Sequence, residues 1–283
     1  MSECLLRTVT VSAVVPFDKL ALPGQPPAQA APYKTLYLLH GVLGDHTDWT
    51  ANTRIQRWAE EKDLAVVMPA GENHFYLDCA ANGERWGQFI GCELPEKMQR
   101  LFGLSPARED NFLAGLSMGG YGALVNGLRF AGRFSRIAGL SSALLLDDLL
   151  EGGTHCPGLS EAMFGPQFFN TVFGDPQSVA GSDRDYYALA RRAAQSGEPL
   201  PKIYLCCGLD DSLLATNRRY ADFLRAQGFA CTYAEAPGGH EWDFWDRFLK
   251  EILDWLPLGP AWAGRGSGNI GKTGKEGEGY EAG

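Results

Sequence analysis

The chain has 283 residues, of which 45% are hydrophobic and 21% are charged, and its formal net charge is -9 at pH 7. This length and composition are ordinary for a single globular α/β domain with a sizeable core. The acidic balance argues against a nucleic-acid-binding protein, which needs a basic surface to neutralise phosphates. Small neutral or modestly charged substrates fit this charge better.

The N-terminal segment lacks the features of a signal peptide. Residues 1–12 contain an acidic residue near the start and then alternate between apolar and polar residues. A signal peptide instead has a basic start and a continuous apolar run. No stretch approaches the roughly 20 apolar residues of a membrane span. The seven cysteines contain no C-x-x-C pair, so they predict neither a zinc site nor a disulfide framework. We therefore expect a cytoplasmic enzyme without a membrane or nucleic-acid partner.

Short apolar runs alternate with helical patterns along most of the chain. Residues 4–15 predict an opening antiparallel strand, and a proline-rich loop follows at 22–32. The later predicted strands are 34–40, 64–68, 111–114, 137–140 and 202–207, and the predicted helices are 52–62, 92–102, 118–130, 214–227 and 241–256. This spacing predicts βαβ units and a mostly parallel sheet that is covered by helices on both faces.

One segment breaks the alternation. Residues 143–198 contain glycines, prolines, an aromatic cluster and an acidic stretch, without a strand series of their own. We interpret them as a small cap insertion over one end of the sheet, within a single domain that spans 1–256. The tail, 257–283, is glycine-rich and polar, and we expect it to be disordered.

The most informative motif is G-x-S-x-G at residues 115–119, between an apolar strand and a helix of small residues. A nucleophile elbow presents its serine on a sharp, strained strand-to-helix turn, which needs glycine on either side. Gly115 and Gly119 meet that need, so Ser117 is the candidate nucleophile. An ordinary tight turn also fits the bare pattern, because the chain contains 35 glycines.

A base and an acid follow in the order that a nucleophile elbow requires, which is Ser, then acid, then His. His240 lies between the apolar run 231–234 and the last predicted helix, which places it on a loop at the carboxyl end of a strand. The acid should follow the strand at 202–207, where Asp210 and Asp211 are adjacent. Only one of them can face His240, and the other suits a helix N-cap. Spacing does not choose between them.

The third part of such a site is a loop that stabilises the oxyanion. Residues 38–44 end an early strand with two glycines, and a loop there offers one backbone N–H while Met118 offers the second. We expect a structural role for His40, because it precedes the serine and would need the wrong chain order.

Taken in order, these motifs resemble the esterase D family of α/β-hydrolases. That family includes tributyrin-type carboxylesterases, feruloyl esterases and S-formylglutathione hydrolases, with mycolyltransferases as more distant relatives. The matching segments are 40–49, 66–69, 93–95, 115–123, 207–213 with Asn217, and 239–242. The resemblance spans about residues 5–256 and implies the α/β-hydrolase fold. In the family pattern C-G-x-x-D-x-L the aspartate is the fifth residue, which corresponds to Asp211.

The resemblance implies a serine carboxylesterase without a metal or organic cofactor. In that reading Ser117, Asp211 and His240 form the catalytic triad, and the N–H groups of Met118 and of Leu43 or Val42 stabilise the oxyanion. Two alternatives stay open: a thioesterase acting on S-formylglutathione, and an acyltransferase with the same triad. The complete triad, elbow and oxyanion loop argue against a third, a catalytically idle hydrolase fold used for binding. Homo-oligomer formation is also left open.

The substrate is expected to be a small ester with a short-chain acyl or a hydroxycinnamoyl (feruloyl) group. W-G-Q at 86–88 and H-E-W at 240–242 are similar to the tributyrin and feruloyl esterase branch. Aromatic side chains of the cap and of the loop after residue 69 are candidates for an acyl pocket, with core packing as the competing explanation. The candidate substrate-binding residues are Trp86, Tyr76, Phe168, Phe169 and Trp242.

Overall fold

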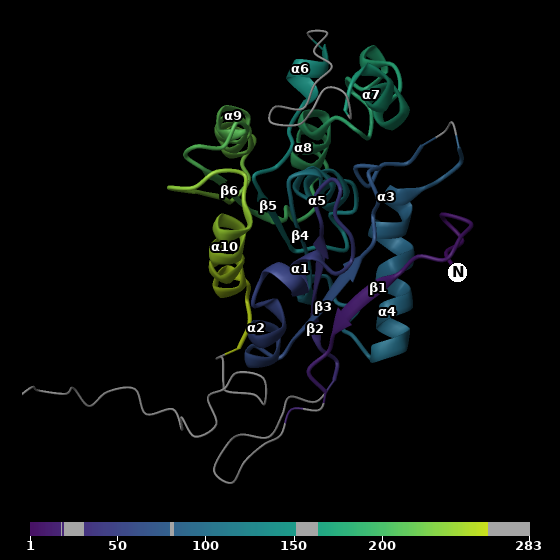
Figure 1. Cartoon of the computed structure of the whole chain (residues 1–283), viewed down its shortest axis with the longest axis vertical. Helices are drawn as coiled ribbons and strands as arrows, with labels where there is room; N and C mark the ends of the chain where they lie inside the picture. Colours follow the sequence, from purple (N-terminus) through teal and green to yellow (C-terminus); the bar gives the residue numbers. More distant parts are fainter. Residues whose placement is uncertain (18, 20–30, 80–81, 151–163, 260–283) are drawn as a thin grey trace, which may run out of the picture.

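A seven-stranded sheet forms the centre of the computed structural model, which describes residues 1–17, 19, 31–79, 82–150 and 164–259 (Figure 1). The strand order is β1-β3-β2-β4-β5-β6-β7. β1 (Val11–Val14) runs antiparallel to its neighbour, and all other neighbouring strands are parallel. The others are β2 (Lys34–Leu39), β3 (Leu64–Pro69), β4 (Asn111–Leu116), β5 (Arg136–Leu140), β6 (Lys202–Gly208) and β7 (Cys231–Ala236). The predicted mostly parallel sheet is confirmed.

Helices cover both faces of this sheet, because successive side chains of a strand point to opposite faces. On β2, Leu36 and Leu38 join one apolar core, whereas Tyr37 and Leu39 join the other. The first core is closed by α1 (Asp48–Asn52), α2 (Ile55–Glu61) and α10 (Trp242–Trp255). The second is closed by α4 (Leu94–Phe102), α5 (Met118–Arg129), α8 (Tyr186–Gln195) and α9 (Leu214–Ala226).

Two helical segments differ from the prediction in detail. The helix expected at 52–62 corresponds to α2, and a short helix that was not predicted, α1, precedes it. Thr53 separates the two helices because its backbone is extended, at φ -136° and ψ 172°. Thr53 Oγ1 also accepts a hydrogen bond from the N–H of Ile55 at 3.2 Å, which favours a new helix start there. Before α4 the chain already forms α3 (Trp86–Gln88) and a π-helical turn, η1 (Phe89–Glu93).

The described residues of the predicted insertion at 143–198 lie in two places. α6 (Leu146–Leu150) follows β5 within a few residues, so it lies at the edge where the parallel strands end, and Figure 1 shows α7 (Pro166–Phe173) at the same end. α8 instead packs against α5 within the helical layer, and Tyr121 Oη donates to the carbonyl of Arg184 at 2.6 Å. Cap residues 151–163 and tail residues 260–283 lie outside the described residues, so the prediction for the tail stays a prediction.

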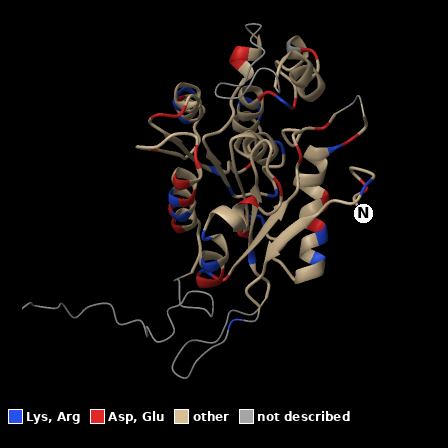
Figure 2. Ribbon diagram, in the orientation of Figure 1, with Lys and Arg blue, Asp and Glu red and all other residues tan. Residues whose placement is uncertain are grey.

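Acidic and basic side chains alternate along the outer face of α10 (Figure 2). They form pairs one helical turn apart, such as Lys250–Asp254 at 2.7 Å and Arg247–Glu251 at 3.6 Å. Among the described residues, no helix combines the length and the apolar character that crossing a bilayer requires.

Candidate active site

The turn between β4 and α5 presents Ser117 in a strained backbone conformation, at φ 52° and ψ -117°. Both flanking positions require glycine, because other backbone atoms lie too close to leave space for a Cβ. A Cβ on Gly115 would lie 2.3 Å from the carbonyl oxygen of Gly119, and one on Gly119 would lie 2.4 Å from that of Leu39. The N–H of Ser117 donates to the carbonyl of Leu140 at 2.9 Å, which ties the turn to β5. The turn therefore has the geometry of a nucleophile elbow.

Three polar side chains converge at the carboxyl edge of the sheet. Ser117 Oγ lies 3.0 Å from His240 Nε2, and His240 Nδ1 lies 2.9 Å from Asp211 Oδ2. His240 comes from the loop between β7 and α10, and Asp211 from the loop after β6. Asp210 is exposed, and its N–H donates to the carbonyl of Gly238 at 3.0 Å. The structure thus brings Asp211 to the imidazole and leaves Asp210 at the surface.

The side chain of Asp211 is fully buried, whereas that of His240 is 35% exposed. Burial alone would raise the pKa of Asp211. Hydrogen bonds from His240, from the N–H of Leu213 and from the Ser141 hydroxyl outweigh that effect and hold the pKa below its usual value. An ionised carboxylate can only accept, so His240 Nδ1 carries the proton and Nε2 is free to accept the proton of Ser117.

The loop after β2 is held in shape by the imidazole of His40. Its Nε2 accepts a hydrogen bond from the N–H of Gly71 at 2.8 Å, so the proton is on Nδ1, which donates to the carbonyl of Gly41 at 2.7 Å. Burial lowers the pKa of His40 and favours the neutral form that this arrangement needs. His40 therefore has a structural role, as the chain order predicts.

Two backbone N–H groups near Ser117 are available for an oxyanion. Within the described part of the chain, neither Val42 N–H nor Met118 N–H has a hydrogen-bond acceptor, and Met118 opens a helix, whose first N–H groups lack intrahelical partners. Leu43, the other predicted donor, is different, because its N–H donates to Asn73 Oδ1 at 2.8 Å. The geometry therefore favours Val42 over Leu43. Asn73 carries no sequence signal that could have identified it.

A hollow of about 500 Å³ opens beside Ser117 and His240. Its remaining lining residues are Gly41, Val42, Leu43, Gly44, Asp48, Leu116, Glu241, Trp242 and Trp245. Among the described lining residues the charged side chains are the acids Asp48 and Glu241, with no lysine or arginine. Of the predicted substrate-binding residues, Trp242 lines this hollow. No group of three or more His, Cys, Asp or Glu side chains in the described ranges is placed to hold a metal ion.

The other predicted substrate-binding residues lie elsewhere. Tyr76 and Trp86 are fully buried, and Tyr76 Oη donates to the carbonyl of His40 at 3.0 Å. Phe168 and Phe169 pack against each other with ring centroids 5.5 Å apart, within a cluster of cap and core aromatics. None of these four side chains lines the hollow beside Ser117. Large aromatic rings gain most by packing on one another, so core packing is the better explanation for them.

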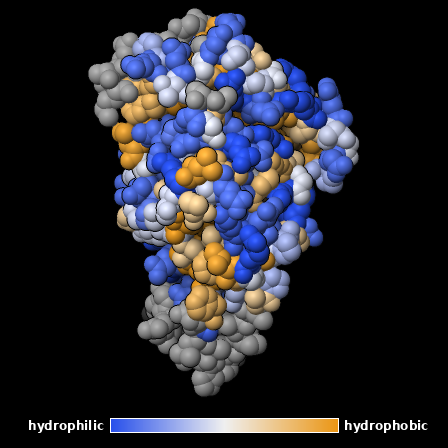
Figure 3. Space-filling model, turned by 90° about the vertical axis from the view of Figure 1, so that its right-hand side faces the viewer, coloured by the Kyte–Doolittle hydropathy of each residue, from blue (hydrophilic) through white to orange (hydrophobic). Residues whose placement is uncertain are grey.

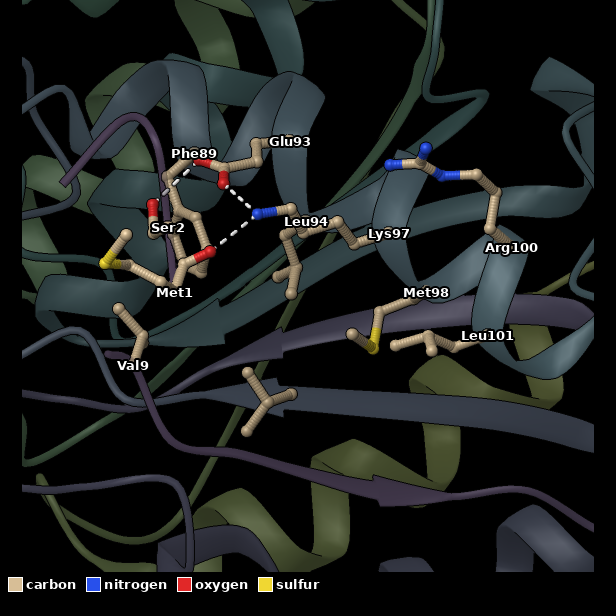
Figure 4. A pocket seen from close by; sticks show the side chains of 11 residues that line it. Met1, Ser2, Val9, Phe89, Glu93, Leu94, Lys97, Met98, Arg100 and Leu101 are labelled. Carbon is tan, nitrogen blue, oxygen red and sulfur yellow. Dashed lines mark hydrogen bonds and ion pairs between the residues drawn. The ribbon is translucent and has the colours of Figure 1, made fainter. Parts of the chain in front are cut away.

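A second hollow, of about 590 Å³, lies between the N-terminal segment and α4 (Figure 4). Apolar side chains are exposed on the face of the molecule that Figure 3 shows. Met1 and Leu101, which line the hollow, are among the exposed apolar residues. The hollow contains none of the three converging residues, and among its described lining residues Glu93 and Lys97 form an ion pair. The chemistry therefore belongs to the smaller hollow at the serine.

In comparisons with known proteins, the chain is similar to an esterase family and to several hydrolases. Residues 19–256 match the Esterase family, described as "Putative esterase". An acetyl esterase of Caldicellulosiruptor saccharolyticus is 38% identical over 259 residues, which cover 90% of this chain and 95% of that protein. FphF, a fluorophosphonate-binding serine hydrolase of Staphylococcus aureus, has a TM-score of 0.77 at 29% identity, covering 90% of this chain and 94% of that one. The S-formylglutathione hydrolase FrmB of the same organism has a TM-score of 0.76 at 29% identity, covering 90% and 95%.

The family match covers most of the chain, and it includes the strand-turn-helix around Ser117 and the loop of His240. The resemblance predicted from the sequence motifs is therefore confirmed. The chain belongs to the Esterase family, within the esterase D group of α/β-hydrolases, and is a serine carboxylic ester hydrolase.

Proposed function

We propose that the protein hydrolyses short-chain acyl esters through a Ser117–His240–Asp211 triad and an acyl-enzyme on Ser117. The observation that carries the proposal is the 3.0 Å separation between Ser117 Oγ and His240 Nε2 at the end of a strained strand-to-helix turn. At that distance the imidazole can take the hydroxyl proton as the oxygen attacks an ester carbonyl.

The remaining steps follow from the groups around the serine. As the carbonyl oxygen becomes an oxyanion, the N–H groups of Met118 and Val42 donate to it. Each such donor contributes on the order of 3 kcal/mol to transition-state stabilisation. Protonated His240, held by the carboxylate of Asp211, then gives its proton to the leaving alcohol. His240 next activates a water that hydrolyses the acyl-enzyme. No step requires a metal or an organic cofactor.

A short acyl group suits this site better than a hydroxycinnamoyl group. The aromatic residues expected to hold a hydroxycinnamoyl ring, Tyr76, Trp86, Phe168 and Phe169, do not line the hollow beside Ser117. The relative that is 38% identical is an acetyl esterase. The acidic lining, Asp48 and Glu241, further favours a neutral alcohol portion over an anionic one.

S-formylglutathione hydrolysis is the second candidate, and the similarity to FrmB supports it. Glutathione carries two carboxylates, which would approach Asp48 and Glu241 without a basic residue among the described lining residues to pair with them. We therefore rank the thioester S-formylglutathione below a carboxylic ester as the substrate. Transfer of the acyl group to an alcohol uses the same intermediate, and a product assay with an added alcohol acceptor distinguishes it from hydrolysis.

The test is a substrate panel with a matched inactive variant. We expect p-nitrophenyl acetate to be hydrolysed faster than the butyrate and decanoate esters, and at least about tenfold faster than methyl ferulate or S-formylglutathione. Ser117→Ala should lower kcat/KM by at least about 10⁴-fold while the thermal unfolding profile is retained. Retained activity in Ser117→Ala would refute the mechanism. Faster turnover of S-formylglutathione would establish the thioesterase alternative instead.

A further inference from the structure

Ser141 has an unusual backbone for a residue with a side chain. It directly follows β5, is fully buried, and has a positive φ of 45°. Its N–H donates to the carbonyl of Cys206 at 2.8 Å, which fixes the turn to β6. A glycine would adopt this left-handed conformation without strain. The presence of serine at such a position points to a use for its hydroxyl.

The hydroxyl of Ser141 lies between an indole and a carboxylate. Trp245 Nε1, which can only donate, lies 3.1 Å from Ser141 Oγ. The hydroxyl therefore accepts from Trp245, which leaves its own hydrogen to point elsewhere. The carboxylate of Asp211 is near enough for Ser141 to help lower its pKa. Burial and the nearby carboxylate of Asp211 raise the pKa of the Cys207 thiol, so the thiol stays neutral beside this pair.

Trp245 contacts the base as well as the hydroxyl. It lies on the first turn of α10, immediately after the loop that carries His240. The two rings are perpendicular, with centroids 4.9 Å apart. Trp245 also lines the hollow beside Ser117. One indole therefore limits the tilt of the His240 ring and, through its N–H, orients the hydroxyl of Ser141.

We propose that Ser141 and Trp245 are positioning residues of the triad: Trp245 orients the hydroxyl of Ser141, and Ser141 holds the carboxylate of Asp211 in line with His240 Nδ1. This inference rests on the proposed function of the triad. The carboxylate already accepts from His240 and from the N–H of Leu213, and the hydroxyl of Ser141 would fix it from a third direction. Neither positioning residue transfers a proton.

Such a role predicts a loss in the chemical step, with little effect on substrate binding. Ser141→Ala should lower kcat for p-nitrophenyl acetate by about tenfold, the usual effect of losing a hydrogen bond to a charged group, and change KM by less than about twofold. Trp245→Phe keeps a ring beside His240 but removes the N–H, so it should lower kcat by a smaller factor, about threefold.

The decisive experiment repeats Ser141→Ala in an Asp211→Asn background. If Ser141 acts through Asp211, the second substitution should lower the residual kcat by less than about twofold, because groups that act as a unit are not additive. A merely structural role would give the same factor in both backgrounds. Equal factors, or an unchanged kcat in Ser141→Ala alone, would overturn the proposal.

Two matched controls are available in the chain. Ser142 is also fully buried, but its hydroxyl has no partner among the described residues, so Ser142→Ala should leave kcat unchanged. The buried Nε1 of Trp58 likewise lacks a partner within the described part of the chain, which makes Trp58→Phe the control for Trp245→Phe. A loss of kcat in these controls equal to that in the test variants would contradict a specific role.

Ser141→Gly separates activity from folding. It removes the hydroxyl and also the strain at φ 45°, so we expect kcat to fall as in Ser141→Ala while the unfolding temperature does not fall below that of Ser141→Ala. Retained kcat in Ser141→Gly would overturn the proposal. Activity in Ser117→Ala would refute the triad itself, whereas inactive Ser117→Ala with fully active Ser141→Ala would refute only the positioning role.

Discussion

Ser117 Oγ and His240 Nε2 lie 3.0 Å apart, although 123 positions separate the two residues in the chain. They meet because each follows the carboxyl end of a parallel strand, and these ends share one edge of the sheet. Asp211 reaches the same edge after β6.

The identity of the acid is tested by two neighbouring substitutions. Asp211→Asn should lower kcat by about 10³- to 10⁴-fold, because the amide cannot hold the imidazole in the required tautomer. Asp210→Asn should change kcat by less than about threefold, since Asp210 is exposed and only its backbone N–H contacts the loop of His240. Steady-state kinetics with p-nitrophenyl acetate measure both. A larger loss at Asp210 would reverse the assignment.

The side chain of Asn73 also holds the oxyanion loop. Its Oδ1 accepts the N–H of Leu43, whose φ of 65° is strained for a residue with a side chain. Asn73→Ala should therefore loosen the loop and lower kcat by about tenfold, less than the loss of a direct oxyanion donor. Asn82→Ala is the control, because Asn82 Oδ1 also accepts a backbone N–H, from Glu84 at 3.0 Å, in a different loop. Equal kcat values in the two variants would argue against this function of Asn73.

The elbow has no space for a side chain at Gly119. A Cβ there would lie 2.4 Å from the carbonyl of Leu39 and 2.6 Å from that of His40. Gly119→Ala should therefore force β2 and the elbow apart and lower the free energy of unfolding by about 3 kcal/mol. Gly132→Ala should be close to neutral, because nothing lies within 4 Å of its Cβ position. Urea unfolding followed by tryptophan fluorescence compares the two variants, and an unaffected Gly119→Ala would show that the elbow is not close-packed.

Glu93 links the N-terminal segment to the helical layer and gives a pH-dependent contribution to stability. Burial alone would raise its pKa. Contacts from Lys97, Ser2 and the N–H groups of Glu3 and Cys4 lower the pKa from 4.5 to about 2 (Figure 4). The folded-state pKa lies below the unfolded one, so this stabilisation is present above about pH 4.5 and is lost as the pH falls towards 2.

Glu93→Gln should therefore destabilise the protein at neutral pH, and the difference from the unsubstituted protein should shrink as the pH falls through that interval. Chemical denaturation at a series of pH values measures the difference. Glu96→Gln provides the control, since Glu96 is exposed and pairs with Arg133 at the surface. A difference that stays constant across the interval would contradict the assigned pKa.

Much of the fold was predictable because its signals are local. Each strand that is buried on both faces is a short continuous apolar run, and all of the predicted strands are present in the sheet. The short helix α1 before the predicted helix was not predicted, because its separation from α2 depends on the extended backbone of Thr53 and on how each helix packs. Likewise, nothing local distinguishes α8, which packs on α5, from the cap helices that precede it.

The aromatic residues show most clearly what could not be predicted from the sequence. Composition and position allowed Tyr76 and Trp86 either to line a pocket or to fill the core, and only their tertiary contacts place them in the core.

The sequence by itself determined the family, the α/β architecture and the serine hydrolase class, because motif order and hydrophobic pattern are properties of the chain. Only the tertiary structure decided which aspartate faces His240 and that the N–H of Leu43 is bound by Asn73, whereas that of Val42 has no acceptor among the described residues. It also decided that Trp245 lies between His240 and Ser141. These relationships are distances between residues on different strands and loops. They come into existence only when the sheet brings the ends of its strands to one edge.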